Sequence, residues 1–245
     1  LCPHHIFQVL TKRADRMRAY CIGLGVPGRE HQIKDAARKA GAPLRDMEVL
    51  SWRITALPLR NVWLGVSAED QARADQRIPD LLATPAALRF VSAEPLLGMV
   101  ELTRLPGCDA LNGRRWGGLD GDVRRGWSSG GNARLDWVIC GGESGRGARP
   151  MHPDWARSLR DQCQAAGVAF FMKQWGEWLP AEFGAAPDIH FQDGSWMDAN
   201  TLPDIDGEDG WAFDEFKAHA LFKRVGKRAA GRLLDGREWN EAPNG

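Results

Sequence analysis

The sequence predicts an α/β fold built on a mostly parallel sheet. Five short apolar runs with little alternation predict strands that are buried on both faces, as strands of parallel sheets are. Helical patterns lie between several of these runs, and a small polar or charged cluster follows each run directly. Because functional groups gather at the carboxyl ends of parallel strands, we expect the clusters to form the rim of one site.

Each predicted strand ends at its own cluster. The runs cover residues 6–10, 62–66, 88–91, 137–140 and 168–172. The clusters begin at Thr11, Ser67, Ser92, Gly141 and Lys173. A helix between the fourth and fifth runs predicts a right-handed βαβ unit with parallel strands.

Four segments have helical periodicity. They are residues 15–24, 31–40, 70–82 and 153–166. The last is the clearest, because Pro153 suits a first turn and Gly167 suits a helix end. Pro79 lies inside the third segment and has no backbone donor, so we expect two helical pieces there.

Length and composition predict one domain. A chain of 245 residues with 43% hydrophobic residues can form a sizeable α/β core over residues 1–245. Irregular loops are expected near 104–134 and 180–210, where turn-forming residues are frequent and periodicity is absent. The first run begins soon after Leu1 without a leader or cap, which favours a chain that begins inside a larger protein.

The charge balance points to no particular partner. Lys plus Arg and Asp plus Glu both total 32, so no net charge steers the chain toward nucleic acid or a membrane. No apolar stretch reaches the roughly 20 residues that span a bilayer. The five cysteines are widely spaced, with no C-x-x-C pair and no signal peptide, which predicts reduced cytoplasmic thiols and no metal site.

Three glutamates follow predicted strands at equivalent positions. They are Glu69, Glu94 and Glu143. A single carboxylate there is usually a cap or a solvated group, but three in one register favour a shared site. Such carboxylates act as acid or base, or hold a ribose, an amine or a cation. Pro95 also restricts the backbone of Glu94, which helps to aim its side chain.

A glycine-rich segment, residues 141–147, follows the fourth run. Backbone N–H groups at Gly141 and Gly142 could approach a phosphate, a carboxylate or an amino-acid-like ligand. A tight turn explains the glycines equally well. The segment is neither the dinucleotide fingerprint nor a P-loop.

Basic residues stand at the same strand ends. Lys12, Arg13, Arg149 and Lys173 could neutralise an anionic ligand, and solvation or a salt bridge explains any one of them equally well. The eleven tryptophans could stack on bases or sugars, but most are expected in the core.

Six ordered motifs resemble those of one family. They are Thr11-Lys12-Arg13, GVSAE at 65–69, SAEPLLG at 92–98, GGESG at 141–145 with Arg149-Pro150, KQWG at 173–176, and GKRAAGRLLDG at 226–236. Together they resemble a phage-associated three-cysteine-motif family of uncharacterised proteins, which is similar to radical S-adenosylmethionine enzymes. The match covers nearly the whole chain apart from loop insertions.

The resemblance implies a partial (β/α) TIM-type barrel in which three cysteines after the first strand hold a [4Fe–4S] cluster. This chain has no such triad. Either this copy has lost its cluster or, as we expect, the chain is the C-terminal two-thirds of a larger protein, without the first strands of the barrel. Open sheet edges would then permit self-association.

The resemblance also implies a cofactor and residue roles. A reduced cluster would cleave S-adenosylmethionine, and the resulting radical would abstract hydrogen from a substrate at the rim. A nucleic acid and a peptide are both possible substrates, and no membrane partner is expected. The implied catalytic residues are Glu94, Glu143 and Lys173. The implied cofactor-binding residues are Lys12, Ser67, Glu69, Gly141, Gly142 and Arg149.

Two other functions remain open. Glu94 and Glu143 could be the carboxylate pair of a glycoside hydrolase, which would place them about 5–9.5 Å apart. Alternatively, the chain is a non-catalytic phage or defence interaction module that keeps the pocket only as a scaffold.

Overall fold

The structure is a computed structural model. It describes residues 4–24, 30–41, 58–116, 127–128, 133–183, 188–191, 196–198, 211–213 and 220–243. Leu1 and Cys2 lie outside these residues.

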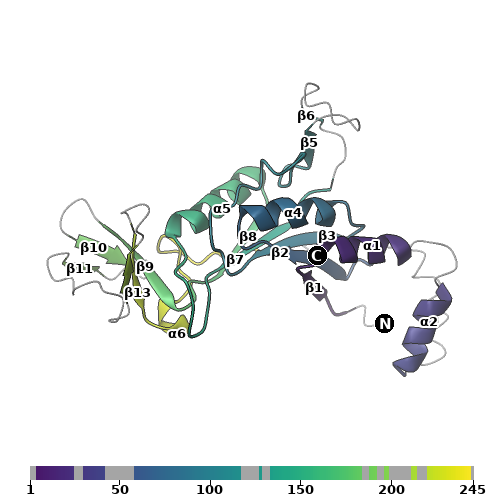
Figure 1. Cartoon of the computed structure of the whole chain (residues 1–245), viewed down its shortest axis with the longest axis horizontal. Coiled ribbons are helices and arrows are strands. Elements are labelled where there is room, and N and C mark those ends of the chain that lie inside the picture. Colours follow the sequence, from purple (N-terminus) through teal and green to yellow (C-terminus); the bar gives the residue numbers. More distant parts are fainter. Residues whose placement is uncertain are drawn as a thin grey trace.

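A five-stranded parallel sheet forms the centre of the molecule (Figure 1). Its strands are β1 (Phe7–Thr11), β2 (Val62–Ser67), β3 (Leu88–Ala93), β7 (Trp137–Gly141) and β8 (Ala169–Gln174), in the order β1-β2-β3-β7-β8. All four neighbouring pairs are parallel. The mixed α/β class and the mostly parallel sheet are therefore confirmed, and each strand coincides with one predicted run. Within the described residues the sheet is open, with β1 and β8 as its edges.

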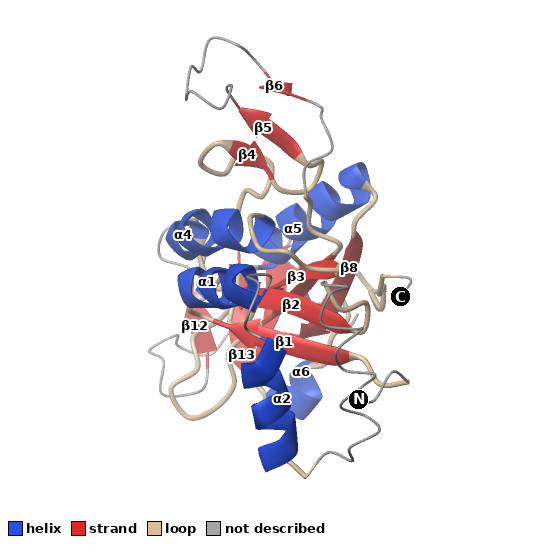
Figure 2. Ribbon diagram, turned by 90° about the vertical axis from the view of Figure 1, so that its right-hand side faces the viewer, coloured by secondary structure: helices blue, strands red, loops and turns tan. Residues whose placement is uncertain are grey.

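Helices cover one face of this sheet. Figures 1 and 2 show α1 (Ala14–Leu24), α4 (Gln71–Leu82) and α5 (Pro153–Ala166) along the same side of the strands, and α2 (Glu30–Lys39) lies beyond α1. No helix of the described residues is long and apolar enough to cross a membrane.

Helix α4 differs from its prediction, because it is continuous through Pro79. The Asp70 side chain caps its start by accepting a hydrogen bond from the Arg73 N–H at 2.8 Å. Ile78 and Leu81, on either side of Pro79, are fully buried. Burial of this apolar face outweighs the one hydrogen bond that proline cannot donate.

The two faces of the sheet have different cores. Val66, Val91 and Cys140 belong to the main core beneath the helices. Trp63, Phe90, Trp137 and their neighbours form a separate aromatic cluster on the opposite face. Apolar residues on both faces explain why the strand runs show so little alternation.

Two smaller antiparallel sheets include strands from the stretches expected to be irregular. One consists of β4 (Cys108–Asp109), β5 (Arg114–Trp116) and β6 (Trp127–Ser128). The other has the order β11-β10-β9-β13-β12, with β9 (Trp178–Phe183), β10 (Asp188–Phe191), β11 (Trp196–Asp198), β12 (Trp211–Phe213) and β13 (Ala220–Arg224). The described parts of 104–134 and 180–210 thus include short strands, whereas residues 117–126, 129–132, 184–187, 192–195 and 199–210 lie outside the described residues. Short antiparallel strands need only a tight turn and a pairing partner, so they leave little periodicity in the sequence.

The C-terminal segment, residues 226–243, returns to the central sheet after β13. It begins with α6 (Lys227–Ala230) and then runs along the outer edge of β8. The Met172 N–H donates to the Trp239 carbonyl at 2.9 Å, and the Glu241 N–H donates to the Phe170 carbonyl at 3.2 Å. This segment therefore supplies hydrogen-bond partners to one edge of the sheet.

Candidate functional site

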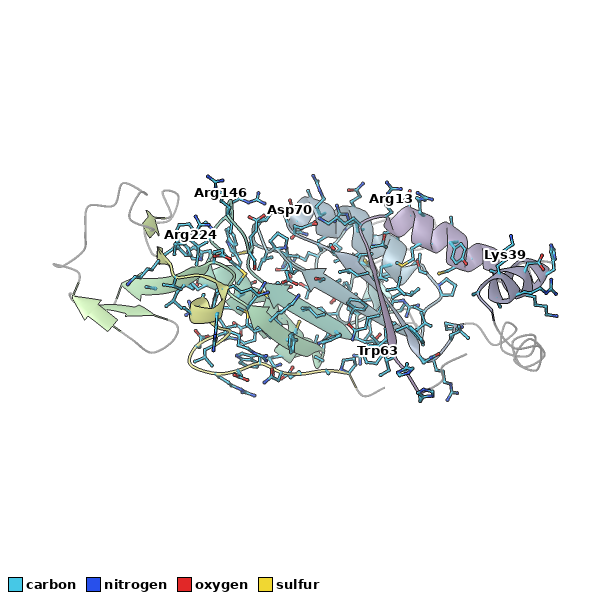
Figure 3. The ribbon with its side chains drawn as sticks, turned by 90° about the horizontal axis from the view of Figure 1, so that it is seen from below. Arg13, Lys39, Trp63, Asp70, Arg146 and Arg224 are labelled. Carbon is cyan, nitrogen blue, oxygen red and sulfur yellow. The ribbon has the colours of Figure 1, made fainter. Side chains whose placement is uncertain are left out.

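The carboxyl edge of the central sheet, where its strands end, is joined by backbone hydrogen bonds. The Leu97 N–H donates to the Glu69 carbonyl at 2.7 Å, and the Leu96 N–H donates to the Gly141 carbonyl at 2.9 Å. Figure 3 shows Arg13 and Asp70, which follow β1 and β2, along one border of the molecule and Trp63 at the opposite border. The strand ends therefore form one continuous edge.

Glu94 lies in the middle of this edge and reaches across β7 to β8. Lys173 Nζ donates to Glu94 Oε2 at 2.8 Å, and Gln174 Nε2 donates to Glu94 Oε1 at 2.9 Å. Gly141 makes this reach possible, because a Cβ there would lie 3.2 Å from the Glu94 carboxyl group. The glutamate carboxylate thus occupies space that a side chain on β7 would otherwise fill.

An irregularity in β8 gives Glu94 both of its partners. Cys140 pairs with Met172, but Gly141 pairs with Gln174, so Lys173 is an extra residue in the ladder. A bulge of this kind changes the direction of side chains relative to regular alternation. Consequently two consecutive side chains, Lys173 and Gln174, contact the same carboxylate.

Glu69 forms a second ion-pair group at the ends of β1 and β2. Lys12 Nζ lies 2.6 Å from Glu69 Oε1, and Arg77 Nη1 lies 2.8 Å from Glu69 Oε2. Arg77 also donates to the Ser67 carbonyl at 3.0 Å. Burial raises the pKa of Glu69, but the hydrogen bond from Lys12 and the charges of Arg77 and Lys12 lower it more, so its net pKa lies below the ordinary value.

Glu143 forms a third group with Arg149 alone. Arg149 Nε and Nη2 donate to the two carboxylate oxygens at 2.8 and 3.0 Å, and the Arg149 backbone N–H adds a bond at 2.9 Å. The side-chain hydrogen bonds from Arg149, followed by the backbone bond, lower the pKa of Glu143. This carboxylate is therefore held in its ionised form against its own loop.

The glycines after β7 are required by close backbone packing. A Cβ at Gly142 would lie 1.9 Å from the Trp175 carbonyl oxygen, and one at Gly176 would lie 2.0 Å from the Glu143 carbonyl oxygen. The Gly142 N–H already donates to the Gln174 carbonyl at 2.8 Å. Packing thus accounts for Gly142 without a ligand.

The predicted site residues fall into three contact groups within the described part of the chain. Glu94 and Lys173 lie in the first, with Gly141 beneath the carboxylate. Lys12 and Glu69 lie in the second, next to Ser67, and Glu143 and Arg149 form the third. No side-chain hydrogen bond or ion pair joins one group to another among the described residues.

Sequence reasoning missed three residues that contact these groups. Gln174 belongs to a quoted motif, but its hydrogen bond to Glu94 depends on the bulge, which nothing in the sequence indicates. Ser144 Oγ lies 3.2 Å from Gln174 Nε2. Arg77 lies eight positions after Glu69. The two side chains meet because the chain reverses direction between β2 and α4. The helical pattern that begins at Asp70 was the one signal in the sequence that could have identified the contact between Arg77 and Glu69.

The described cysteines do not suit an iron–sulfur cluster. No group of three or more His, Cys, Asp or Glu residues in the described ranges could hold a metal ion. Cys140 and Cys163 are fully buried, and burial raises both thiol pKa values, that of Cys163 to about 12. Cluster ligands are thiolates, whereas these two side chains are neutral thiols.

The first group has the chemistry for a small polar ligand. The Glu94 side chain is 19% exposed and that of Lys173 is 49% exposed, so both are accessible. A carboxylate has about four acceptor positions, of which Lys173 and Gln174 use two. The remaining positions could accept hydrogen bonds from an ammonium group or from hydroxyl groups.

Comparisons with known proteins place the chain in a family without assigning a reaction. No curated protein and no solved structure matches the chain. The model of one family, described as "Protein of unknown function (DUF5131)", matches residues 1–243. That match spans the central sheet, the three ion-pair groups and the C-terminal segment. The chain therefore belongs to the DUF5131 family.

Proposed function

We propose that the carboxyl edge of the central sheet binds S-adenosylmethionine and that the chain is the later part of a radical S-adenosylmethionine-type enzyme with a partial (β/α) barrel. The observation that carries this proposal is the Glu94 carboxylate, held between Lys173 and Gln174 at a parallel-strand end. An amino-acid moiety needs an acceptor for its ammonium group and a cation for its carboxylate. Glu94 and Lys173 offer both.

The partial-barrel arrangement is supported by the open parallel sheet, along one face of which α1, α4 and α5 lie. In a barrel, the opposite face points inward and the site lies at the carboxyl ends of the strands. The aromatic cluster with Trp63 and Trp137 would line that interior. The strands needed to continue the curve beyond β1 would come from a larger protein.

The iron–sulfur cluster does not fit the described residues, so its ligands would have to come from elsewhere. We derive no step from it. The described residues would bind and orient S-adenosylmethionine, with Glu94 as the acceptor and Lys173 as the neighbouring cation. Free thiols at Cys21, Cys108, Cys140 and Cys163 support a cytoplasmic location for this enzyme.

Titration calorimetry with S-adenosylmethionine tests the proposal directly. We expect binding by the chain, and Glu94→Gln and Lys173→Met should each weaken it about tenfold, or roughly 1.4 kcal/mol. Asp35→Asn, an equal loss of one carboxylate on the distant helix α2, should leave the affinity unchanged. Absence of binding at millimolar ligand, or equal loss in the control, contradicts the proposal.

Reconstitution then tests the reaction class. The full-length protein, loaded with iron and sulfide without oxygen, should convert S-adenosylmethionine into methionine and deoxyadenosine. If neither product forms and Glu94→Gln retains the cellular phenotype, the chain is a non-catalytic interaction module instead.

The glycoside hydrolase alternative has weaker support. Such an enzyme needs one carboxylic acid with a raised pKa beside one carboxylate. Arg149 lowers the pKa of Glu143, and Glu94 is ion-paired with Lys173. Glu143 therefore lacks the environment of a proton donor.

A further inference from the structure

A cavity lies where the C-terminal segment meets the end of β8. It has a volume of 350 Å³ and is lined by Lys173, Gln174, Lys227, Arg228, Gly231 and Arg232. We call it the cationic cavity. The Trp175 N–H donates to the Gly231 carbonyl at 3.1 Å, and Trp175 Nε1 donates to the Leu233 carbonyl at 2.7 Å. These two bonds fix the walls of the cavity relative to each other.

The lining of the cationic cavity has a surplus of positive charge. It includes four basic side chains and no acidic one. Glu94 balances Lys173, but Lys227 and Arg228 are exposed and have no ion pair among the described residues. Like charges that gather in a concave surface attract anions, because the field is concentrated there.

Arg232 is held in this wall with donors that have no acceptor. Its Nε and Nη2 atoms are buried and have no hydrogen bond among the described residues. The guanidinium carbon lies 5.0 Å from the centre of the Phe171 ring, and Nη2 forms a long ion pair with Glu238 Oε2 at 3.9 Å. Unsatisfied buried donors are costly, so an acceptor oxygen in the cavity would stabilise the arrangement.

Gln174 adds an acceptor to the same wall. This residue is 7% exposed. Its Nε2 donates hydrogen bonds to Glu94 and Ser144. Its Oε1 is buried and accepts no hydrogen bond in the described part of the chain. The cavity thus combines cationic donors with one vacant acceptor. A ligand that has a hydroxyl group close to a phosphate matches this combination.

We propose that the cationic cavity binds the phosphate of a nucleotide, either free or within a nucleic-acid strand. The planar guanidinium of an arginine can donate two parallel hydrogen bonds to phosphate oxygens. Lys227 and Arg228 add positive charge at the rim of the cavity. A sugar hydroxyl beside the phosphate would donate to Gln174. This inference extends beyond S-adenosylmethionine binding and does not depend on it, although Lys173 contributes to both sites.

Binding measurements on the full chain test this assignment. The probes are inorganic phosphate, AMP, adenosine and a 5′-phosphorylated DNA dodecamer, measured by calorimetry at low salt. The double variant Lys227→Gln/Arg228→Gln should weaken AMP binding at least about tenfold, because it removes the two exposed cations. Both residues are on the surface, so the variant should melt at the wild-type temperature.

A matched control separates the cavity from general charge effects. Arg38→Gln/Lys39→Gln removes an adjacent basic pair from α2, where Figure 3 shows Lys39 at the far end of the molecule. AMP affinity should be unchanged in this control. Equal loss in both double variants, or failure of every phosphate probe to bind the wild type more tightly than adenosine, overturns the proposal.

The probes also distinguish the source of the phosphate. A dodecamer that binds more tightly than AMP, with a steep salt dependence, identifies nucleic acid, whereas equal affinity identifies a free nucleotide. Arg232→Lys keeps the positive charge but removes the paired donors of the guanidinium. It should weaken AMP binding whether the natural ligand is a nucleic acid or a free nucleotide. If phosphate binding persists while S-adenosylmethionine fails to bind, only the proposed function is contradicted.

Discussion

The two edges of the central sheet differ in what covers them. Along β8, the C-terminal segment forms hydrogen bonds such as the one from the Met172 N–H to the Trp239 carbonyl at 2.9 Å, and Trp137 Nε1 on the neighbouring β7 donates to the Glu241 carbonyl at 2.9 Å. Along β1, Phe7, Val9 and Leu10 are each between 44% and 49% exposed. The Glu94 group and the cationic cavity both lie toward the covered edge. The carboxyl edge therefore has its densest polar contacts near β8, where the C-terminal segment, distant in sequence, packs against the sheet.

The largest expected effect on stability comes from a substitution that breaks the close packing near β8. Gly142→Ala should destabilise the fold by roughly 3 kcal/mol or more, because the new methyl group would overlap the Trp175 carbonyl. Urea unfolding measures this loss. Gly147→Ala has nothing within 4 Å of the new Cβ and should change the stability by less than about 0.5 kcal/mol. Similar losses in both variants would contradict the packing explanation.

The next effect tests how the C-terminal segment is anchored. Asp235 pairs with Arg157 at 2.6 Å and also with Arg160, both on α5. Asp235→Asn should cost about 2 kcal/mol, since it removes the one carboxylate that these two partly buried arginines share. Asparagine also tolerates the positive φ of 55° at this position.

The control for Asp235 lies on the same helix. Asp161 contacts Arg160 from a more exposed position, with 66% of its side chain accessible. Asp161→Asn should therefore cost at most about 1 kcal/mol in thermal unfolding. A larger loss for Asp161→Asn than for Asp235→Asn would show that the segment is anchored elsewhere.

A smaller effect tests the exposed β1 edge. We expect the chain to self-associate through β1, and Leu10→Lys should raise the dissociation constant about tenfold in sedimentation experiments, because lysine on an edge strand opposes pairing. Met99→Lys introduces the same charge at a residue that is 48% exposed and outside the sheet edge, and it should have no effect. A wild-type chain that is monomeric at all concentrations contradicts the prediction.

The smallest effect concerns the ion pair beside β1. Lys12 is 63% exposed at its side chain, so Lys12→Met should cost only about 0.5 kcal/mol near neutral pH. The folded pKa of Glu69 lies below its ordinary value of 4.5. Its ionised form therefore adds stability above pH 4.5, and this contribution is lost as the pH falls through the lowered pKa.

A pH series of chemical denaturation curves tests that sign. The difference between wild type and Lys12→Met should be constant above pH 5 and should disappear in stronger acid. Lys39→Met on α2 should show no such pH dependence. A difference that grows toward low pH would exclude the Lys12–Glu69 pair as its cause.

Local patterns were enough to predict the five strands of the central sheet and most helices. Continuous apolar runs such as Trp137–Gly141 have few alternative structures, and α5 has the bounds that Pro153 and Gly167 indicate. Pro79 misled the prediction for α4, because local propensity does not include the burial of Ile78 and Leu81. The short strands β9 to β13 depend on antiparallel partners, which periodicity alone does not reveal.

The candidate site was only partly predictable for a similar reason. Position at a strand end identified Glu69, Glu94 and Glu143, but it could not indicate which cation each would contact. Gln174 contacts Glu94 only because β8 contains one extra residue opposite β7. The contact between Lys173 and Glu94 spans 79 positions in the sequence. Pairings over such distances follow from the register of the whole sheet.

The C-terminal segment also has a consequence for the order of folding during synthesis. The hydrogen bond between Trp137 and Glu241 joins residues 104 positions apart, so it cannot form until Glu241 has left the ribosome. Until then, β8 is an unpaired edge and the cationic cavity has no second wall. Contacts this distant in sequence slow folding and leave edges open to wrong partners. We therefore expect the β8 edge to be most open to wrong partners before Glu241 has left the ribosome.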